Sequence, residues 1–274
     1  MVQYKVEKVS FVILSWNSEK YLEKCLDSII NLKNIDYEII LVDNGSTDNS
    51  IDIIEKFMKK NNKIQLIKLE KNYGTTISRN KGLHKIKNTD YICILDSDTI
   101  INDNAILLMS NYLKKNSKVG IVGPEMINGE GERQIPYRRF PTWKIKLLKA
   151  CPIKKISKLG EQIENYDVDN LPDDFECDYL ISACWMMRFK TYKLNGDLDE
   201  KIFYSPEDVE YCMRVRKNNL SIVHMKNAQI VHFYQRISKK KLISKANLTH
   251  LWGIHYVLKK YKKFLKKYRK ESVN

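Results

Sequence analysis

The sequence lacks any closely spaced pair of cysteines. Its six cysteines are scattered, none belongs to a Cys-x-x-Cys motif, and several lie in apolar runs such as Tyr91–Leu95. Cysteines placed in this way are typical of small core residues that keep reduced thiols in a cytosolic protein. This distribution argues against a structural zinc site.

Long hydrophobic runs are also missing. No stretch has the roughly twenty apolar residues that a membrane-spanning helix needs, and residues 1–8 carry mixed charges without the apolar core of a secretory signal. With 43% hydrophobic and 10% aromatic residues, the composition is that of a globular protein. We therefore expect a cytoplasmic protein that is soluble or peripheral on the cytosolic face of the cell membrane.

Acidic residues are almost absent from the C-terminal part of the chain. Residues 211–274 contain 17 Lys and Arg but a single acid, Glu271, whereas residues 1–210 contain 31 basic and 32 acidic residues. The excess positive charge therefore lies in the tail, unlike the more uniform charge expected of a basic nucleic-acid-binding protein. This distribution argues against a nucleic acid as partner and predicts that the tail faces another surface, which is anionic.

Strand and helix patterns alternate through the first half. Short apolar runs are followed by segments in which apolar residues recur at helical spacing. We expect strands at 9–14, 38–42, 64–69, 91–95 and 119–122, with helices at 19–30, 49–60, about 75–85 and 105–113. This alternation predicts an α/β fold with a mostly parallel central sheet and helices on both faces.

The alternation stops at Gly123. From there to residue 178 prolines interrupt the pattern, and the segment ends in an acidic stretch that begins at Glu161. These features indicate a long insertion that could shape an acceptor pocket. Strand patterns return at 179–189 and around 221–232.

An amphipathic helix is predicted in the basic tail. From Ile254 to Tyr268 the apolar residues fall on one side of an ideal helix, and the Lys and Arg residues fall on the other. Two interpretations remain open. The apolar side can lie in an anionic membrane interface, or it can pack on the rest of the protein and leave the lysines in solvent.

Polar clusters follow four of the predicted strands, where ligands bind in sheets of this kind. One of them contains two carboxylates separated by one residue, Asp96 and Asp98, which can hold a hard cation such as Mg²⁺ or Mn²⁺. Such an ion would bridge the two phosphates of a nucleotide sugar. Alone, such a pair of carboxylates is more typical of a solvated loop. The polar clusters that follow the other strands favour the interpretation as a metal site.

The neighbouring clusters offer groups for the rest of a nucleotide. Asp43, in a tight turn, can accept a hydrogen bond from a base N–H, and Trp16 can offer a ring face for base stacking. Arg79 can be a surface arginine, or it can neutralise a diphosphate or contact the base.

Three acids follow Pro206, and such a cluster can simply begin a helix, where acids are favoured. Alternatively Asp208, with Glu207 as second choice, is the general base that takes a proton from an attacking hydroxyl. His232 ends a strand-like run and is either a core residue or a third metal ligand beside Asp98.

Together and in this order, these motifs resemble the family 2 glycosyltransferases with the GT-A fold, particularly the bacterial branch that contains rhamnosyltransferases of cell-surface polysaccharide assembly. The matching stretches are 9–17, 38–50, 72–82, 91–98, 138–142, 195–214 and 228–232. The branch often has Asn-Pro-Asp in place of Asp96-Ser97-Asp98, which makes its rhamnosyltransferases a looser guide to the donor.

The resemblance implies an inverting, metal-dependent transfer from a nucleotide-diphosphate sugar to a polyprenyl-linked or other saccharide acceptor in surface polysaccharide or glycolipid assembly. The roles it implies are nucleobase binding by Asp43 and Trp16, ribose and metal binding by Asp96, metal binding by Asp98 and His232, and general base catalysis by Asp208. The expected domains are a catalytic domain over 1–236, with a nucleotide-binding half at 1–123 and an acceptor-side half at 124–236, and a basic helical tail over 237–274.

Two other functions remain open. A nucleotidyltransferase of the same fold would need a glycine-rich loop after the first strand, where this chain has the segment 15–18 without glycine. A nucleotide-sugar- or RNA-binding protein without catalysis would not require the acidic pair Glu207 and Asp208, and the neutral charge of residues 1–210 argues against it.

Overall fold

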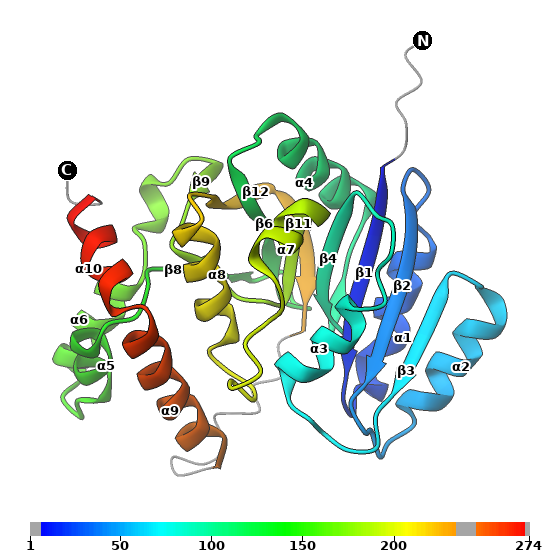
Figure 1. The fold of residues 1–274 in the computed structure, drawn as a ribbon, viewed down its shortest axis with the longest axis horizontal. Coiled ribbons are helices and arrows are strands. Elements are labelled where there is room, and N and C mark those ends of the chain that lie inside the picture. The colour runs from blue at the N-terminus through cyan, green and yellow to red at the C-terminus, as the bar shows by residue number, and fades with distance from the viewer. Residues whose placement is uncertain (1–6, 234–244, 272–274) are drawn as a thin grey trace.

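A ten-stranded sheet forms the centre of the computed structural model, which describes residues 7–233 and 245–271 (Figure 1). Eight strands lie in the order β3-β2-β1-β4-β11-β6-β12-β5, while β7 pairs with β6 and β9 with β12. The strands are β1 Lys8–Ser15, β2 Asp36–Asp43, β3 Ile64–Lys68, β4 Tyr91–Asp96, β5 Thr99–Ile100, β6 Val119–Ile127, β7 Arg133–Gln134, β9 Asp174–Glu176, β11 Cys184–Arg188 and β12 Ser221–His232. Two further strands, β8 Tyr137–Arg138 and β10 Tyr179–Leu180, pair with each other.

Most of the long strands run in the same direction. β1 is parallel to β2 and β4, β2 is parallel to β3, and β6 is parallel to β12. β11 is antiparallel to both of its neighbours, β4 and β6. The mostly parallel sheet predicted from the sequence is confirmed, and its carboxyl-terminal edge carries the ends of β1, β2, β4 and β12.

Helices cover both faces of this sheet. They are α1 Glu19–Ile30, α2 Ser50–Lys60, α3 Thr75–Leu83, α4 Asp103–Lys115, α5 Trp143–Ala150, α6 Lys154–Glu164, α7 Phe189–Asn195, α8 Glu207–Lys217, α9 Lys245–Lys260 and α10 Lys262–Glu271, with a 3₁₀ turn at Val168–Asn170. Side chains of α1, α2 and α4 belong to the core on one face, and those of α3, α7, α8, α9 and α10 to the core on the other. A three-layer α/β arrangement results.

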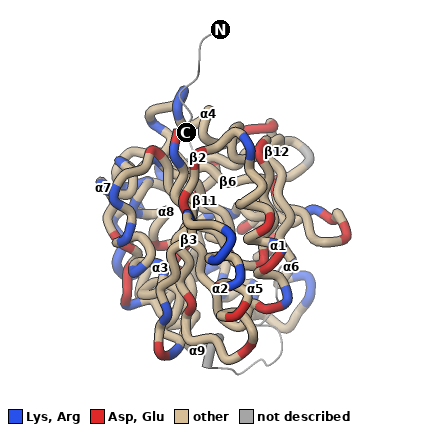
Figure 2. Tube along the Cα trace, turned by 90° about the vertical axis from the view of Figure 1, so that its right-hand side faces the viewer, with Lys and Arg blue, Asp and Glu red and all other residues tan. Residues whose placement is uncertain are grey.

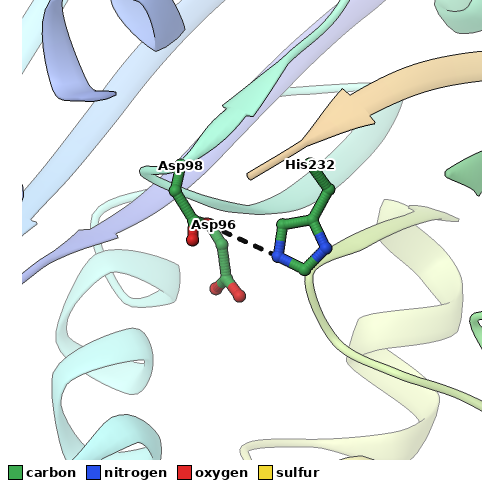
Figure 3. A group of neighbouring side chains, drawn as sticks. All are labelled: Asp96, Asp98 and His232. Atoms are coloured by element: carbon green, nitrogen blue, oxygen red, sulfur yellow. Dashed lines mark ion pairs between the residues drawn. The ribbon is translucent and has the colours of Figure 1, made fainter. Parts of the chain in front are cut away.

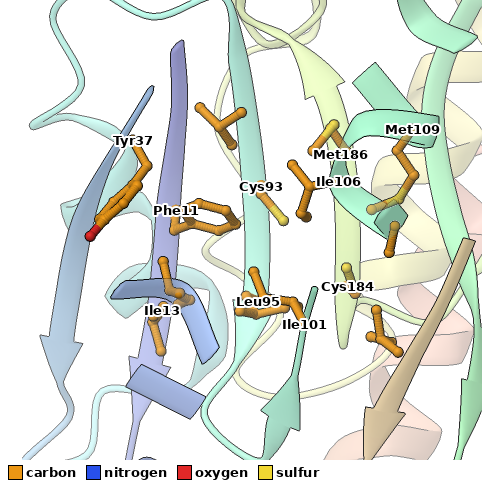
Figure 4. Close-up of a cluster of buried hydrophobic side chains, with 14 of the residues drawn as sticks. Phe11, Ile13, Tyr37, Cys93, Leu95, Ile101, Ile106, Met109, Cys184 and Met186 are labelled. Atoms are coloured by element: carbon orange, nitrogen blue, oxygen red, sulfur yellow. The ribbon is translucent and has the colours of Figure 1, made fainter. Parts of the chain in front are cut away.

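Alternation along the strands divides side chains between the two cores. In β1, Phe11 and Ile13 face the core under α1 and α4, whereas Val12 faces the opposite core. Figure 4 shows Phe11 and Ile13 together with Cys93 and Cys184 in the first core. All six cysteines are free and five are buried, as expected of small core residues.

The segment predicted as an insertion contains regular structure. β6 continues through Gly123, where the sequence-based division into halves was placed, and ends at Ile127. The chain then forms β7 and β8, the helical hairpin of α5 and α6, and β9 before it reaches β10. Both expected halves therefore contribute strands to one sheet.

The tail forms two helices that pack on the second core. Its predicted apolar stripe is largely buried, and the buried members are Ile254, Val257, Leu258, Tyr261 and Leu265. The structure therefore shows the packing interpretation, in which this stripe is not available to a membrane. The predicted boundary at residues 236 and 237 lies outside the described residues.

A buried carboxylate joins the tail to α8. Glu210 is fully buried, and its Oε1 accepts hydrogen bonds from Lys260 Nζ at 2.8 Å and from Tyr261 Oη at 2.7 Å. Arg214, on the same side of α8, contacts the other oxygen. None of the helices within the described ranges has both the length and the apolar character required to cross a bilayer.

Candidate functional site

Four loops meet at the carboxyl-terminal edge of the sheet, as the polar clusters predicted. The Ser18 and Ser97 hydroxyls are 2.7 Å apart, which joins the loop after β1 to the loop after β4. Asn44, after β2, donates from its amide to Asn72 Oδ1 at 3.0 Å and from its backbone N–H to the carbonyl of Ser15 at 2.8 Å. These hydrogen bonds hold the loops in one rigid layer.

Gly74 allows the chain to approach a segment that is distant in sequence. Its φ is +84°, and a Cβ at this position would lie 2.1 Å from the carbonyl oxygen of Phe203. The next residue, Thr75, donates its N–H to that same oxygen at 2.6 Å. Only glycine fits here, and the contact brings the segment before α8 to the edge of the sheet.

A cleft of about 300 Å³ lies between these elements. Its lining includes Arg79, Asp96, Asp98, Ser182, Glu207, Asp208 and His232. The cleft therefore contains every predicted catalytic and metal-binding side chain, together with Arg79. The two residues predicted to bind a nucleobase, Trp16 and Asp43, do not line it and lie on the adjacent loops.

Asp96, Asp98 and His232 point toward one another (Figure 3). One ligand atom from each lies within 4.8 Å of the others, and His232 Nε2 is 3.5 Å from Asp98 Oδ1. β4 carries Asp96 at its last position, and β12 carries His232 at its last position. Two carboxylates and an imidazole at this separation form a donor set that suits Mg²⁺ or Mn²⁺.

Gln134 determines which nitrogen of His232 faces the carboxylates. Its Nε2 donates to the backbone carbonyl of His232 at 2.7 Å, so its Oε1 accepts from His232 Nδ1–H at 3.0 Å. Nε2 is then the ring nitrogen that faces Asp98. An imidazole nitrogen and a carboxylate oxygen placed in this way can both ligate one cation, so the residues present fit a metal ion.

Arg79 lies beneath the carboxylates. Its side chain is only 2% exposed, and it donates to Asp96 Oδ1 at 2.6 Å and to Glu207 Oε1 at 3.3 Å. Ser182 completes the network, because its hydroxyl accepts from Arg79 and donates to Glu207 at 2.8 Å. Arg79 is therefore not a surface arginine; it lines the cleft and ties the end of β4 to the start of α8, while its role toward a diphosphate or a base stays a prediction.

The two adjacent acids of α8 have different surroundings. Glu207 is buried and holds hydrogen bonds to Arg79 and Ser182, whereas Asp208 is half-buried, faces the cleft and accepts from the N–H of Val209 at 2.8 Å. Burial raises the pKa of both carboxyls, and the charge of Asp208 adds to the rise in the pKa of Glu207. Asp208 is thus the more accessible proton acceptor.

Asp43 presents an acceptor that has no partner within the described chain. Oδ2 accepts from the N–H of Ser46 at 3.0 Å, while Oδ1 is buried and makes no hydrogen bond to any described residue. Trp16, on the neighbouring loop, is 44% exposed. An unpaired buried carboxylate oxygen costs free energy unless a ligand donates to it, which fits the predicted contact with a base N–H.

Two residues of this site were missed from the sequence, Gln134 and Ser182. Gln134 lies on the two-residue strand β7 and Ser182 in the loop between β10 and β11. Neither stands in a motif, and each acts on a residue about one hundred positions away. No periodicity in the sequence reports such contacts.

A second cleft of about 470 Å³ adjoins the first, and Ile181 lines both. Its other walls come from β7, β8 and the end of β12, and they include Arg133, Gln134, Arg138 and Phe233. Residues of the segment predicted as an insertion therefore line a cleft that adjoins the first one, and the role of this cleft as an acceptor pocket stays a prediction.

Residues 10–194, more than half of the chain, match the family model described as Glycosyl transferase family 2. The chain is 36% identical over 118 residues to the poly-beta-1,6-N-acetyl-D-glucosamine synthase of Staphylococcus epidermidis, which covers 43% of this chain and 28% of the synthase. It is 25% identical over 258 residues to the poly(ribitol-phosphate) beta-N-acetylglucosaminyltransferase TarP of Staphylococcus aureus, covering 89% and 76% of the two chains.

Among solved structures, GalNAc-T7 with UDP, GalNAc and Mn²⁺ superimposes with a TM-score of 0.69 at 17% identity. The match covers 94% of this chain and 48% of GalNAc-T7, and it establishes a shared fold. The chain thus spans about a quarter of the length of the synthase and about half of that of GalNAc-T7.

Proposed function

The chain belongs to glycosyl transferase family 2, and on this basis we propose that it is an inverting, metal-dependent glycosyltransferase. It would move a sugar from a nucleotide-diphosphate donor to an acceptor hydroxyl. The observation that carries this proposal is the placement of Asp208 in the same cleft as Asp96, Asp98 and His232. A binding protein needs no accessible base beside a metal site.

We assign the metal to Asp96, Asp98 and His232. When bound, the ion would neutralise negative charge on the departing diphosphate. Gln134 would hold the imidazole ring in the orientation and tautomer that binding requires. The Mn²⁺ in the structure of GalNAc-T7 supports this assignment, since the two proteins share a fold.

The donor side would consist of the cleft wall at the end of β4 together with the adjacent loops after β1 and β2. Asp43 Oδ1 would accept a base N–H, and the exposed ring of Trp16 would stack on the base. A ring N–H of this kind is present in uracil, and the UDP in the structure of GalNAc-T7 supports a uridine nucleotide. Arg79 would act from below by holding Asp96 in place.

The acceptor side is formed by the start of α8 and by the second cleft. Asp208 would take the proton of the acceptor hydroxyl while that oxygen attacks the anomeric carbon from the face opposite the diphosphate. The new bond forms as the bond to the diphosphate breaks, so the configuration at this carbon inverts. The raised pKa of Asp208 brings its basicity closer to that needed near neutral pH.

We further propose that the acceptor is a saccharide of a bacterial surface polymer or its polyprenyl-linked precursor. The names of two relatives support this class: one synthesises poly-beta-1,6-N-acetyl-D-glucosamine and the other glycosylates poly(ribitol-phosphate). The second cleft offers Arg138 on its wall, which suits an acceptor that carries phosphate or other negative groups, whereas Arg133 is already paired with Glu125.

The proposal is tested by incubating the protein with a panel of nucleotide sugars and Mn²⁺ and measuring release of the nucleoside diphosphate. We expect turnover with one donor, loss of that turnover on chelation, and its loss in Asp98→Ala. Asp52→Ala, which removes an exposed acid on α2, serves as the matched control and should behave like the wild type. Donor binding without turnover for the whole panel would favour the non-catalytic alternative.

A further inference from the structure

The outer face of α5 is apolar and exposed. Ile145 packs inward, whereas Trp143, Leu147 and Ala150 follow one another at i, i+4 and i+7 on the opposite side. Trp143 is 47% exposed and Leu147 is 70% exposed, and Ile153, just before α6, is 57% exposed. Helical spacing of exposed apolar residues indicates a face that a partner covers.

α9 extends this face. The ring of Trp143 lies 5.8 Å from that of His255, and Leu251, one turn earlier on the same side of α9, is 53% exposed. We refer to Trp143, Leu147, Ile153 and Leu251 as the α5 patch. It is distinct from the apolar stripe of the tail, which is buried.

Positive charge surrounds the α5 patch. Lys144, Lys154, Lys155 and Lys158 are exposed and form no ion pair with any other described residue. The two remaining lysines of this hairpin, at positions 146 and 149, are paired with Glu164. Figure 2 shows basic positions interspersed with acidic ones over much of the trace. The last two helices are also basic, but their apolar stripe is largely buried, so the hairpin differs by combining unpaired lysines with an exposed apolar face.

The combination of an exposed apolar face with unpaired lysines identifies the kind of partner that the α5 patch fits. A second copy of this chain would bring the same lysines face to face, on a protein that already carries a formal net charge of +15. An anionic bilayer offers negative headgroups to the lysines and an apolar interior to Trp143 and Leu147, and tryptophan is favoured at that interface. We propose that the α5 patch docks this protein on the surface of an anionic lipid bilayer.

Docking of this kind would place the bilayer beside α9, the helix that packs on the segment before α8 and so supports the candidate site. α9, which carries Leu251, packs on the segment before Glu207: a Cβ at Gly253 would lie 2.6 Å from Pro206, and His250 Nδ1 is 3.1 Å from Ser205 Oγ. The proposal concerns attachment only, so it does not depend on the proposed transfer reaction.

The test is flotation of the full chain with vesicles of phosphatidylglycerol and phosphatidylcholine in equal parts, and with vesicles of phosphatidylcholine alone. We expect the wild type to float with the first and to remain at the bottom with the second. Leu147→Asp should weaken binding by at least about tenfold, because an apolar side chain no longer enters the interface. Leu194→Asp on α7, where the leucine is 60% exposed, adds the same charge far from the patch and should bind like the wild type.

A second pair of variants tests the charge. The double change Lys154→Glu with Lys155→Glu should reduce binding to the anionic vesicles by about fivefold or more for each lysine removed. Lys59→Glu with Lys60→Glu, at the exposed end of α2, changes the net charge by the same amount and should have little effect.

Several results would overturn the proposal: a wild type that stays at the bottom with both vesicles, equal flotation with both, or equal losses in Leu147→Asp and Leu194→Asp. Self-association in the absence of vesicles that is abolished by Leu147→Asp would assign the patch to a second copy and would also overturn it. Thermal melting of all variants checks that these exposed substitutions leave the fold intact.

Discussion

On the donor side, three loops that follow neighbouring strands are joined to one another by hydrogen bonds between Ser18 and Ser97 and between Asn44 and Ser15. On the proposed acceptor side, Glu207 at the start of α8 accepts a hydrogen bond from Ser182, which follows the two-residue strand β10, and α9 packs on the segment before α8. The donor side is thus assembled by the order of strands in the sheet, and the acceptor side by contacts between residues far apart in sequence. We expect changes on the two sides to have separable effects.

The strongest separation is expected from Asp208→Asn. This change removes the proton acceptor but keeps the size of the side chain, so transfer should fall by a factor of about 10²–10⁴ while donor affinity remains. Steady-state kinetics of transfer and calorimetric titration with the donor nucleotide measure the two quantities. A comparable loss of donor affinity would show that the two sides are not separable.

Gln134 lies on the proposed acceptor side but contacts His232, one of the proposed metal ligands. Gln134→Leu removes the acceptor of His232 Nδ1–H, and the affinity for Mn²⁺ should fall by about 10–100-fold. Gln134→Glu keeps an acceptor for His232 Nδ1–H, so its affinity for Mn²⁺ should fall less than that of Gln134→Leu. Titration with Mn²⁺ followed by calorimetry measures both, with Gln65→Leu on the exposed part of β3 as the control. Equal affinity in all of these variants would contradict the assignment of His232 as a ligand.

Gly74 is the point at which the two sides touch, and its replacement should loosen the junction. Gly74→Ala and Gly196→Ala impose similar backbone strain, because the two glycines have φ of +84° and +73°, but only the first meets another atom, the carbonyl oxygen of Phe203. The collision should lower the free energy of unfolding by about 1–3 kcal/mol more than Gly196→Ala does. Urea denaturation measures the difference, and no difference would contradict the contact.

The smallest effect expected is a displacement of the pH profile. A base acts only when deprotonated, and burial raises the pKa of Asp208, so activity should be lost as the pH falls through a range above the ordinary value of about 4. The residual activity of Asp208→Asn should lack this acidic limb. A wild-type limb centred near 4 would show that another group is titrating.

The sequence predicts where the residues of the proposed donor side lie, because they stand at the ends of strands. A parallel sheet brings the ends of β1, β2 and β4 to one edge, so Asp43, Asp96 and Asp98 could be placed there from their positions in the chain alone. The spacing of apolar residues also identified the buried side of the tail, including Ile254 and Leu258.

The acceptor side could not be predicted in the same way. Nothing near Gln134 in the sequence indicates that it faces His232, because the contact depends on where the turn after β6 returns the chain. The burial of Arg79 likewise depends on Ser182 and Glu207, which reach it from two other elements. The periodicity of apolar residues shows which face of a segment is buried, but it does not show which other segment that face contacts.

The contacts of Glu210 have a consequence for the order in which the segments of the nascent chain fold. The carboxylate is fully buried, and two of its partners, Lys260 and Tyr261, lie some fifty positions later in the chain. Until the ribosome has added those residues, the carboxylate of Glu210 in α8 can pair with Arg214 but not yet with Lys260. We expect the nascent chain to complete the donor loops first and the segment that bears the proton acceptor only once α9 has been synthesised.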